Sequence, residues 1–271
     1  MSGALGQASG RPGSAAYDWF SEAALVSVTV VVAVGMSRLF TDWSFLPDVL
    51  ALAAVSHVVG AATRRARLST PPAALLCGGS LVLTATVLLY AETAWTVLPT
   101  LDTLQAARQH LVDAWSVAGA SAAPVVPVPG LVLCAGAALG LSAFLADTAA
   151  FRMRAAVTAV VPASAVYGFT VAAGTGDGAV KHGALFSGAV GASLVSSWLR
   201  NRRDDAWVES GPGRGALAMA RAGTAALMTA VVAGAVGGPW LPGASAEPWV
   251  DLARFEVTDA APWVDSPSPE P

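Results

Sequence analysis

The stretch GLVLCAGAALGLSAFLADTAAFRMR, residues 130–154, decides the fold of this chain. Its apolar part is about 17 to 20 residues long, which is the length that an α-helix needs to cross the ~30 Å hydrocarbon core of a bilayer. Arg152 and Arg154 then stop the run, as basic residues do where a helix leaves a membrane. Asp147 is the exception, because a carboxylate inside hydrocarbon is costly and needs a reason to be there.

The composition of the whole chain agrees with this interpretation. The 271 residues are 55% apolar and only 12% charged, and the mean hydropathy is +0.60, whereas soluble domains carry about 25% charged residues. The charges gather in short clusters between long apolar stretches. We therefore predict an all-α, polytopic integral membrane protein of the cell (plasma) membrane. The N-terminus lacks the pattern of a cleavable signal peptide, so we expect its first apolar stretch to be retained.

Hydropathy divides the chain into three parts. Residues 1–21 form a polar N-terminal tail, residues 22–238 a helix bundle, and residues 239–271 an extended tail rich in Pro, Ser and acidic residues. Within the bundle we predict seven transmembrane helices, at residues 22–40, 46–62, 72–90, 129–151, 155–173, 181–199 and 216–238.

The basic residues predict the orientation of these helices. Basic residues concentrate in cytoplasmic loops, and a cytoplasmic N-terminus places eleven of the 15 basic residues on the cytoplasmic side. An odd number of spans then makes the C-terminus extracytoplasmic. The cytoplasmic anchors that we predict at the helix ends are Arg64, Arg65, Arg67, Arg152, Arg154, Arg200, Arg202 and Arg203.

An amphipathic segment lies in the long extracytoplasmic loop. Near residues 100–116, the sequence LDTLQAARQHLVDAW places apolar residues on one helical face at spacings of three and four. Asp102 followed by Gln105 resembles a capping box. We expect a helix that lies on the outer leaflet or over the bundle, and a substrate-gating lid is the alternative.

Three polar residues inside the predicted spans form a candidate site. His57, Asp147 and Arg221 each lie near the cytoplasmic end of a different span. The helix rise of 1.5 Å per residue brings them to within about 10 Å of the same interface. We predict an intramembrane polar cluster in which Asp147 pairs with Arg221 or His57. Its function is either an interhelical clamp, with snorkelling of side chains to the headgroups, or a proton or ion relay.

Other sequence features favour packing over chemistry. Cys77 and Cys134 lie at different depths with no basic neighbour, so neither a disulfide nor a reactive thiolate is expected. Gly136 and Gly140 form a GxxxG pair that permits close helix approach. We find no metal-binding, cofactor-binding or hydrolase motif, and no basic surface interleaved with aromatic residues that would bind nucleic acid.

Four segments resemble the N-terminal membrane domain of the TgpA family of transglutaminase-like proteins, in its actinobacterial form. They are LPTLDTLQAARQHLVDAW (98–115), the apolar residues 127–168, SSWLRNRRDDAWVESGPGRG (196–215) and GGPWLPGASAEPWVDLAR (237–254). The resemblance implies a bundle that anchors an extracytoplasmic papain-like domain with a Cys-His-Asp triad. No residue of this chain matches that catalytic motif.

From these observations we expect a domain that is not an enzyme by itself and that anchors or positions cell-envelope chemistry. Its partners would be the lipid bilayer and other membrane or envelope proteins. The sequence stops at Pro271, where the catalytic domain of the family would begin, so it is either a piece of a longer protein or a stand-alone relative. The alternative function is a small-solute or ion transporter subunit that uses His57, Asp147 and Arg221.

Overall fold

A computed structural model describes residues 14–120, 122–176, 178–205, 232 and 236. These residues form an all-helical fold with no extended strand. A 3-10 turn follows the first helix at Met36–Arg38, and a π-helical turn follows the fifth at Thr148–Arg152. The helices are α1 (Ser14–Gly35), α2 (Leu46–Arg65), α3 (Thr70–Leu89), α4 (Leu101–Ala120), α5 (Pro129–Asp147), α6 (Ala156–Ala173) and α7 (Ala179–Asp205).

Five helical segments are long and apolar enough to cross a membrane, and they match the first five predicted spans. They are Asp18–Arg38, Leu46–Arg65, Thr70–Leu89, Pro129–Arg152 and Ala156–Ala173. The predicted span at residues 216–238 lies outside the described residues, except for residues 232 and 236. The prediction of a helical bundle is therefore confirmed, while the seventh span stays a prediction.

Helix α7 differs from the other long helices in its composition. It occupies the position of the predicted span 181–199, but it is not among the apolar candidate spans. His182 and several Gly and Ser residues dilute its hydropathy. The same small residues pack well, because Ser193, Ser196 and Ser197 are almost completely buried. A membrane span in α7 remains a prediction, whereas its place in the bundle is clear.

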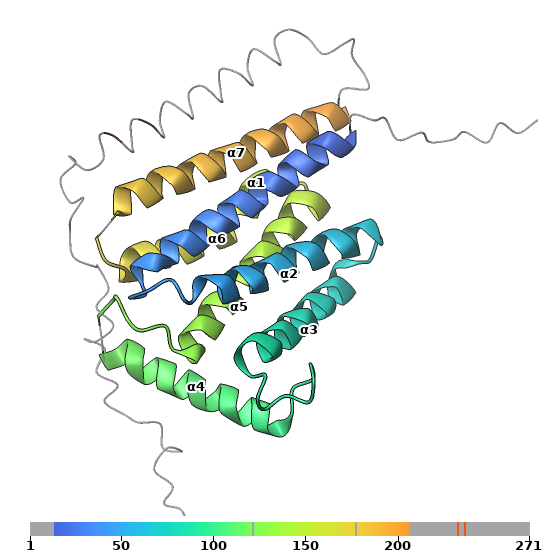
Figure 1. The fold of residues 1–271 in the computed structure, drawn as a ribbon. Helices are drawn as coiled ribbons and strands as arrows, with labels where there is room; N and C mark the ends of the chain where they lie inside the picture. The colour runs from blue at the N-terminus through green and yellow to red at the C-terminus, as the bar shows by residue number, and fades with distance from the viewer. Residues whose placement is uncertain (1–13, 121, 177, 206–231, 233–235, 237–271) are drawn as a thin grey trace, which may run out of the picture.

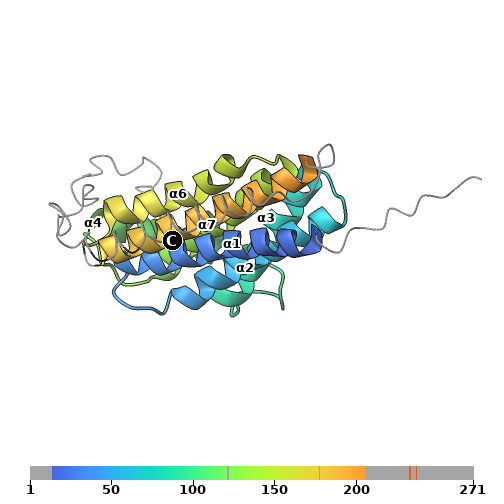
Figure 2. The same ribbon diagram turned by 90° about the horizontal axis from the view of Figure 1, so that it is seen from above.

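Two pairs of helices make the most extensive contacts in the bundle. Helix α7 runs beside α1, and α5 runs beside α2, with α3 and α6 flanking the second pair (Figures 1 and 2). Glycines allow α5 to approach α2: a Cβ at Gly136 would overlap the side chain of Leu52, and one at Gly140 would lie 3.0 Å from Ser56 Oγ. The predicted close approach at the GxxxG pair is confirmed.

The outward faces of these helices are strongly apolar. Leu75 and Val82 of α3 are 78% and 53% exposed, Val58 of α2 is 67% exposed, and Val157 of α6 is 69% exposed. Water-soluble monomers rarely expose apolar surface on this scale. Such outer faces suit helices that contact hydrocarbon.

Helix α4 lies across one end of the bundle, against α5 (Figure 1). Its N-terminus is capped by Thr100, whose hydroxyl accepts a hydrogen bond from the backbone N–H of Thr103 at 3.2 Å. The predicted capping box at Asp102 and Gln105 is therefore wrong. The helix starts earlier than that pattern requires, because Thr100 and Thr103 form a reciprocal cap in its place: the backbone N–H of Thr100 also donates to Thr103 Oγ1 at 3.1 Å.

Gly130 sets the distance between α4 and α5. A Cβ at this position would overlap the carbonyl oxygen of His110 and approach Ala114 Cβ to 2.8 Å. Backbone atoms cannot move aside as a flexible side chain can, so α4 would have to shift.

We expect Gly130→Ala to lower the free energy of unfolding in detergent by about 1–3 kcal/mol, the usual cost of overpacking. Gly79→Ala on α3 is the matched control, because a Cβ there meets no atom within 4 Å, and it should be neutral or slightly stabilising. Thermal unfolding of both variants checks this. Equal stability of the two variants would contradict the close packing of α4 on α5.

Candidate functional site

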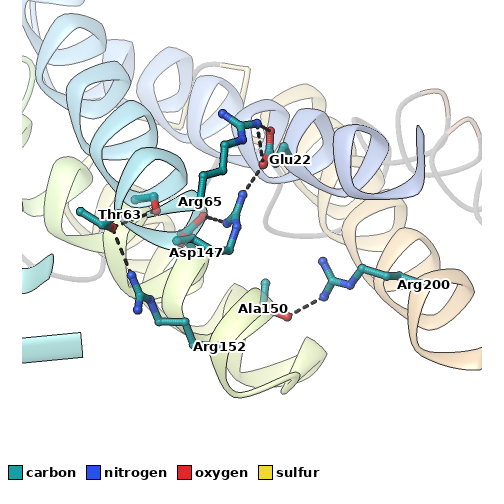
Figure 3. A network of polar contacts seen from close by, with 9 residues as sticks. Glu22, Thr63, Arg65, Asp147, Ala150, Arg152 and Arg200 are labelled. Carbon is teal, nitrogen blue, oxygen red and sulfur yellow. Dashed lines mark hydrogen bonds and ion pairs between the residues drawn. The ribbon is translucent and has the colours of Figure 1, made fainter. Parts of the chain in front are cut away.

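Arginines from three elements gather at one end of the bundle, which we call the basic end. Arg64 and Arg65 close α2, Arg152 closes the π-helical turn, and Arg200 lies near the end of α7. Figure 3 shows Arg65, Arg152 and Arg200 with their polar partners. Arg38 lies at the opposite end, where its Nε donates to the carbonyl oxygen of Thr175 at 2.7 Å.

The remaining predicted anchors also follow the helices or turns that end at the basic end. Arg67 and Arg154 lie in the connections that leave α2 and the π-helical turn, both with positive φ. Arg202 and Arg203 belong to the last turns of α7, and their side chains lie outside the described part of the structure.

Arg64 is the centre of the basic end. One nitrogen of its guanidinium, Nη1, donates to Asp147 Oδ1, and the other, Nη2, donates to Glu22 Oε1. Arg65 adds a contact to Glu22 Oε2 at 3.3 Å. These ion pairs connect α1, α2 and α5. A planar guanidinium suits such double recognition, because its donors point in fixed directions.

Asp147 is buried inside this group, with 3% of its surface exposed. It can approach α2 because Gly60 has no side chain: a Cβ on Gly60 would lie only 3.2 Å from Asp147 Oδ2. Oδ2 has no hydrogen-bond partner among the described residues. The carboxylate therefore depends on Arg64 for its compensation in the low-dielectric interior.

The ring of Phe151 packs against two arginines of the basic end, Arg64 and Arg200. The guanidinium carbon of Arg64 lies 3.7 Å from the centre of its ring, and that of Arg200 lies 4.4 Å away. Both distances are within the range of cation–π attraction. Asp147 and Phe151 are four residues apart, and residues at this spacing share a helical face, so both can contact Arg64.

The other arginines satisfy backbone carbonyls that the helix ends leave without partners. Arg200 Nη2 donates to the carbonyl oxygen of Ala150 at 2.5 Å. Arg152 donates to the carbonyl oxygen of Leu68 and to Thr63 Oγ1. These contacts connect α7 to the π-helical turn, and that turn to the α2–α3 connection.

His57 has a different partner from the one predicted. Its Nε2 lies 2.9 Å from Thr29 Oγ1 on α1, and that hydroxyl also lies 3.2 Å from the carbonyl oxygen of Leu25. The hydroxyl either donates to Leu25 and accepts from a protonated His57 Nε2, or donates to an unprotonated Nε2. This contact joins α1 to α2 at a position seven residues before Arg64, further from the basic end.

A cavity of about 360 Å³ lies between α1 and α2, beside the ion pairs. His57, Asp147, Glu22 and Arg65 line it together with Leu25, Val26 and other apolar side chains. The structure thus brings His57 and Asp147 to one cavity without a hydrogen bond between them. Arg221, the third member of the predicted cluster, lies outside the described residues.

Sequence reasoning missed Glu22, Gly60 and Phe151. Glu22 stood at the predicted start of a span, where an acid needs no explanation. The spacing of Gly60 and Arg64 contained a usable signal, because residues four apart share a helical face. A glycine at this spacing from an arginine leaves space on the surface of α2 next to a cation. A carboxylate of a neighbouring helix fits into that space.

The described residues of this arrangement make ion pairs, cation–π contacts and hydrogen bonds. Within the described ranges, no three His, Cys, Asp or Glu side chains gather closely enough to hold a metal ion. Cys77 and Cys134 are both free thiols, and Cys77 lies 3.6 Å from Ser56 Oγ among packed side chains. The ion pairs can instead fix the relative positions of helices.

We expect Arg64→Gln to be more destabilising than Asp147→Asn. The first change leaves Asp147 buried without a counter-charge, which costs about 3–5 kcal/mol, whereas the second leaves Arg64 with Glu22. Asp147→Asn should therefore restore part of the stability that Arg64→Gln removes. Unfolding of the wild type, both single variants and the double variant in detergent measures this coupling.

Arg67→Gln is the control for the loss of one positive charge at this end, since Arg67 is exposed, and it should change stability by less than about 0.5 kcal/mol. Strictly additive effects of Arg64→Gln and Asp147→Asn would show that the two side chains do not act as a pair.

The chain was also compared with known proteins. The family model described as the TgpA N-terminal domain matches residues 28–260, which is most of the chain and includes α2 to α7. No curated protein and no solved structure gave a significant match. This domain is the N-terminal part of the family and not its catalytic transglutaminase-like domain. The expected resemblance is confirmed, and the chain belongs to the family of the TgpA N-terminal domain.

Proposed function

We propose that this chain anchors and positions a transglutaminase-like cell-envelope protein in the cell membrane and is not catalytic by itself. In this arrangement the basic end faces the cytoplasm, and α4 and the C-terminal tail lie outside. The partners are the lipid bilayer and other membrane or envelope proteins.

The observation that carries the proposal is that the outer surface of the bundle is apolar, whereas charged side chains lie paired inside it. Leu75, Val58 and Val157 present apolar side chains outward from three different helices. Inside the bundle, Glu22, Arg64 and Asp147 contact one another. A bundle of this kind suits a rigid membrane anchor.

The position of the arginines supports the orientation. Arg64, Arg65, Arg152 and Arg200 all lie at one end, and arginine clusters next to spans favour the cytoplasmic side. The C-terminal end of the chain would then lead to the extracytoplasmic side, where the family's catalytic domain is expected.

A reporter experiment tests anchoring and orientation together. We expect a protein fused after residue 271 to stay with the membrane through an alkaline carbonate wash and to be digested by protease added outside intact spheroplasts. The matched control is the same reporter inserted after Leu68, in the short connection at the basic end. That reporter should be protected from the protease until the membrane is broken.

Release of the protein by carbonate would contradict an integral anchor. Protection of the reporter after residue 271, together with digestion of the one after Leu68, would reverse the proposed orientation while leaving the anchor itself intact.

A further inference from the structure

Helix α4 (Leu101–Ala120) has one side that the bundle does not use. The side that packs on the bundle contains Thr103, His110 and Ala114, which are buried or half-buried. Each of them is followed directly by a large apolar residue, namely Leu104, Leu111 and Trp115. One residue turns an α-helix by about 100°, so these three side chains form a separate face beside the buried one.

This apolar face is open to its surroundings. Leu104 is 58% exposed, Leu111 41% and Trp115 71%, and Leu101 extends the face at 76%. Arg108 lies within it, and an arginine in such a place can lay its aliphatic stem on apolar surface while its guanidinium reaches polar groups. The sequence predicted the stripe of leucines but left open whether the stripe would face the leaflet or the bundle.

The opposite side of α4 is polar. Asp102, Gln105, Gln109 and Asp113 are all exposed there, and Gln109 Nε2 donates to Asp113 Oδ1 at 3.1 Å. The helix therefore has a buried side, an apolar side and a polar side. Such a division is typical of a helix that lies in the plane of a membrane interface.

Contacts on its buried side hold α4 in this orientation. Thr103 Oγ1 donates to the carbonyl oxygen of Thr93 at 3.0 Å, and the His110 ring stacks on Tyr90 with centroids 5.5 Å apart. Gly130 allows the backbones of α4 and α5 to touch at His110. A helix fixed in this way does not suit the alternative of a swinging lid.

The apolar face continues into neighbouring surface that is also exposed in the described part of the structure. The loop before α4 exposes Trp95 at 74% and Leu98 at 50%, and the end of α3 exposes Val87 and Leu88 at 44% and 39%. The outer face of α3 is apolar along its length. Tryptophans favour the boundary between lipid and water, and Trp95 and Trp115 both belong to this end of the bundle.

From these observations we infer that α4 is a membrane-binding helix. Its apolar face enters the lipid leaflet at the end of the bundle opposite the basic end, and its polar side faces water. The apolar face consists of Leu101, Leu104, Leu111 and Trp115. The inference rests on the proposed membrane location of the bundle. It adds a second mode of lipid contact, in the plane of the leaflet, that would fix how deeply and at what tilt the bundle sits.

Spin labels in liposomes test this contact. In a background with Cys77→Ala and Cys134→Ala, a nitroxide is attached to Leu104→Cys or Leu111→Cys, and to Gln105→Cys or Gln109→Cys as matched controls one residue or two away. Val82→Cys on the outer face of α3 is the reference for a lipid-exposed site. Collision rates with molecular oxygen, which concentrates in lipid, and with a water-soluble nickel chelate are compared.

We expect the labels at positions 104 and 111 to resemble the one at position 82, with frequent oxygen collisions and at least fivefold fewer nickel collisions than at positions 105 and 109. Frequent nickel collisions at 104 and 111 would overturn the inference, because the face would then be in water. Protection from both reagents would overturn it too, since protein would cover the face. Failure of the position 82 label to show lipid exposure would instead contradict the membrane bundle itself.

Discussion

The guanidinium of Arg64 is the contact on which the rest of this bundle depends. Lipid supplies no hydrophobic force that would drive one apolar helix against another, so packing and polar contacts must determine which helices meet. Arg64 contacts three elements at once: it pairs with Glu22 on α1 and with Asp147 on α5, and it lies over the ring of Phe151 in the π-helical turn. Arg200 joins α7 to the same turn. Removing this cation would leave Asp147 without its ion pair and Glu22 with Arg65 alone, so the polar contact among α1, α2 and α5 would be lost.

The two ends of the molecule are held by different means. The basic end uses charges, whereas the opposite end uses backbone pairing and close packing. There, Thr41 N–H donates to the carbonyl oxygen of Val125 at 3.0 Å, and Val125 N–H donates to that of Leu39 at 2.8 Å. Gly130 and the threonines around Thr103 then fix α4 over the end of α5. Between these ends, Gly136 and Gly140 keep α2 and α5 close.

The sequence predicted the position of residues along the helix axes well, but it predicted poorly toward which neighbouring helix each side chain points. Hydropathy located five helices that are long and apolar enough to cross a membrane, and helix rise placed Asp147 and His57 toward the same end of the bundle, because both depend only on position along the chain. The partner of Asp147 depends on rotation about the helix axis and on which helices are neighbours, and a single sequence holds neither. The sequence therefore predicts an interfacial anchor at Arg64, although Arg64 is the partner of Asp147. The leucines of α4 show the same limit: their spacing revealed a stripe, but the bundle packs on the residues beside it, since Thr103 and Ala114 are small enough for close contact.

We propose that these contacts form a bundle built for position, in which Asp147 serves as an ion-pair partner of Arg64 and not as a carrier of protons. Proton flux measured in proteoliposomes under an imposed pH gradient tests that claim most directly. The account predicts that wild-type protein adds no flux to that of protein-free liposomes and that Asp147→Asn changes nothing. A flux that appears with the wild type and disappears with Asp147→Asn would contradict it, and it would make the cavity beside His57 and Asp147 part of a pathway.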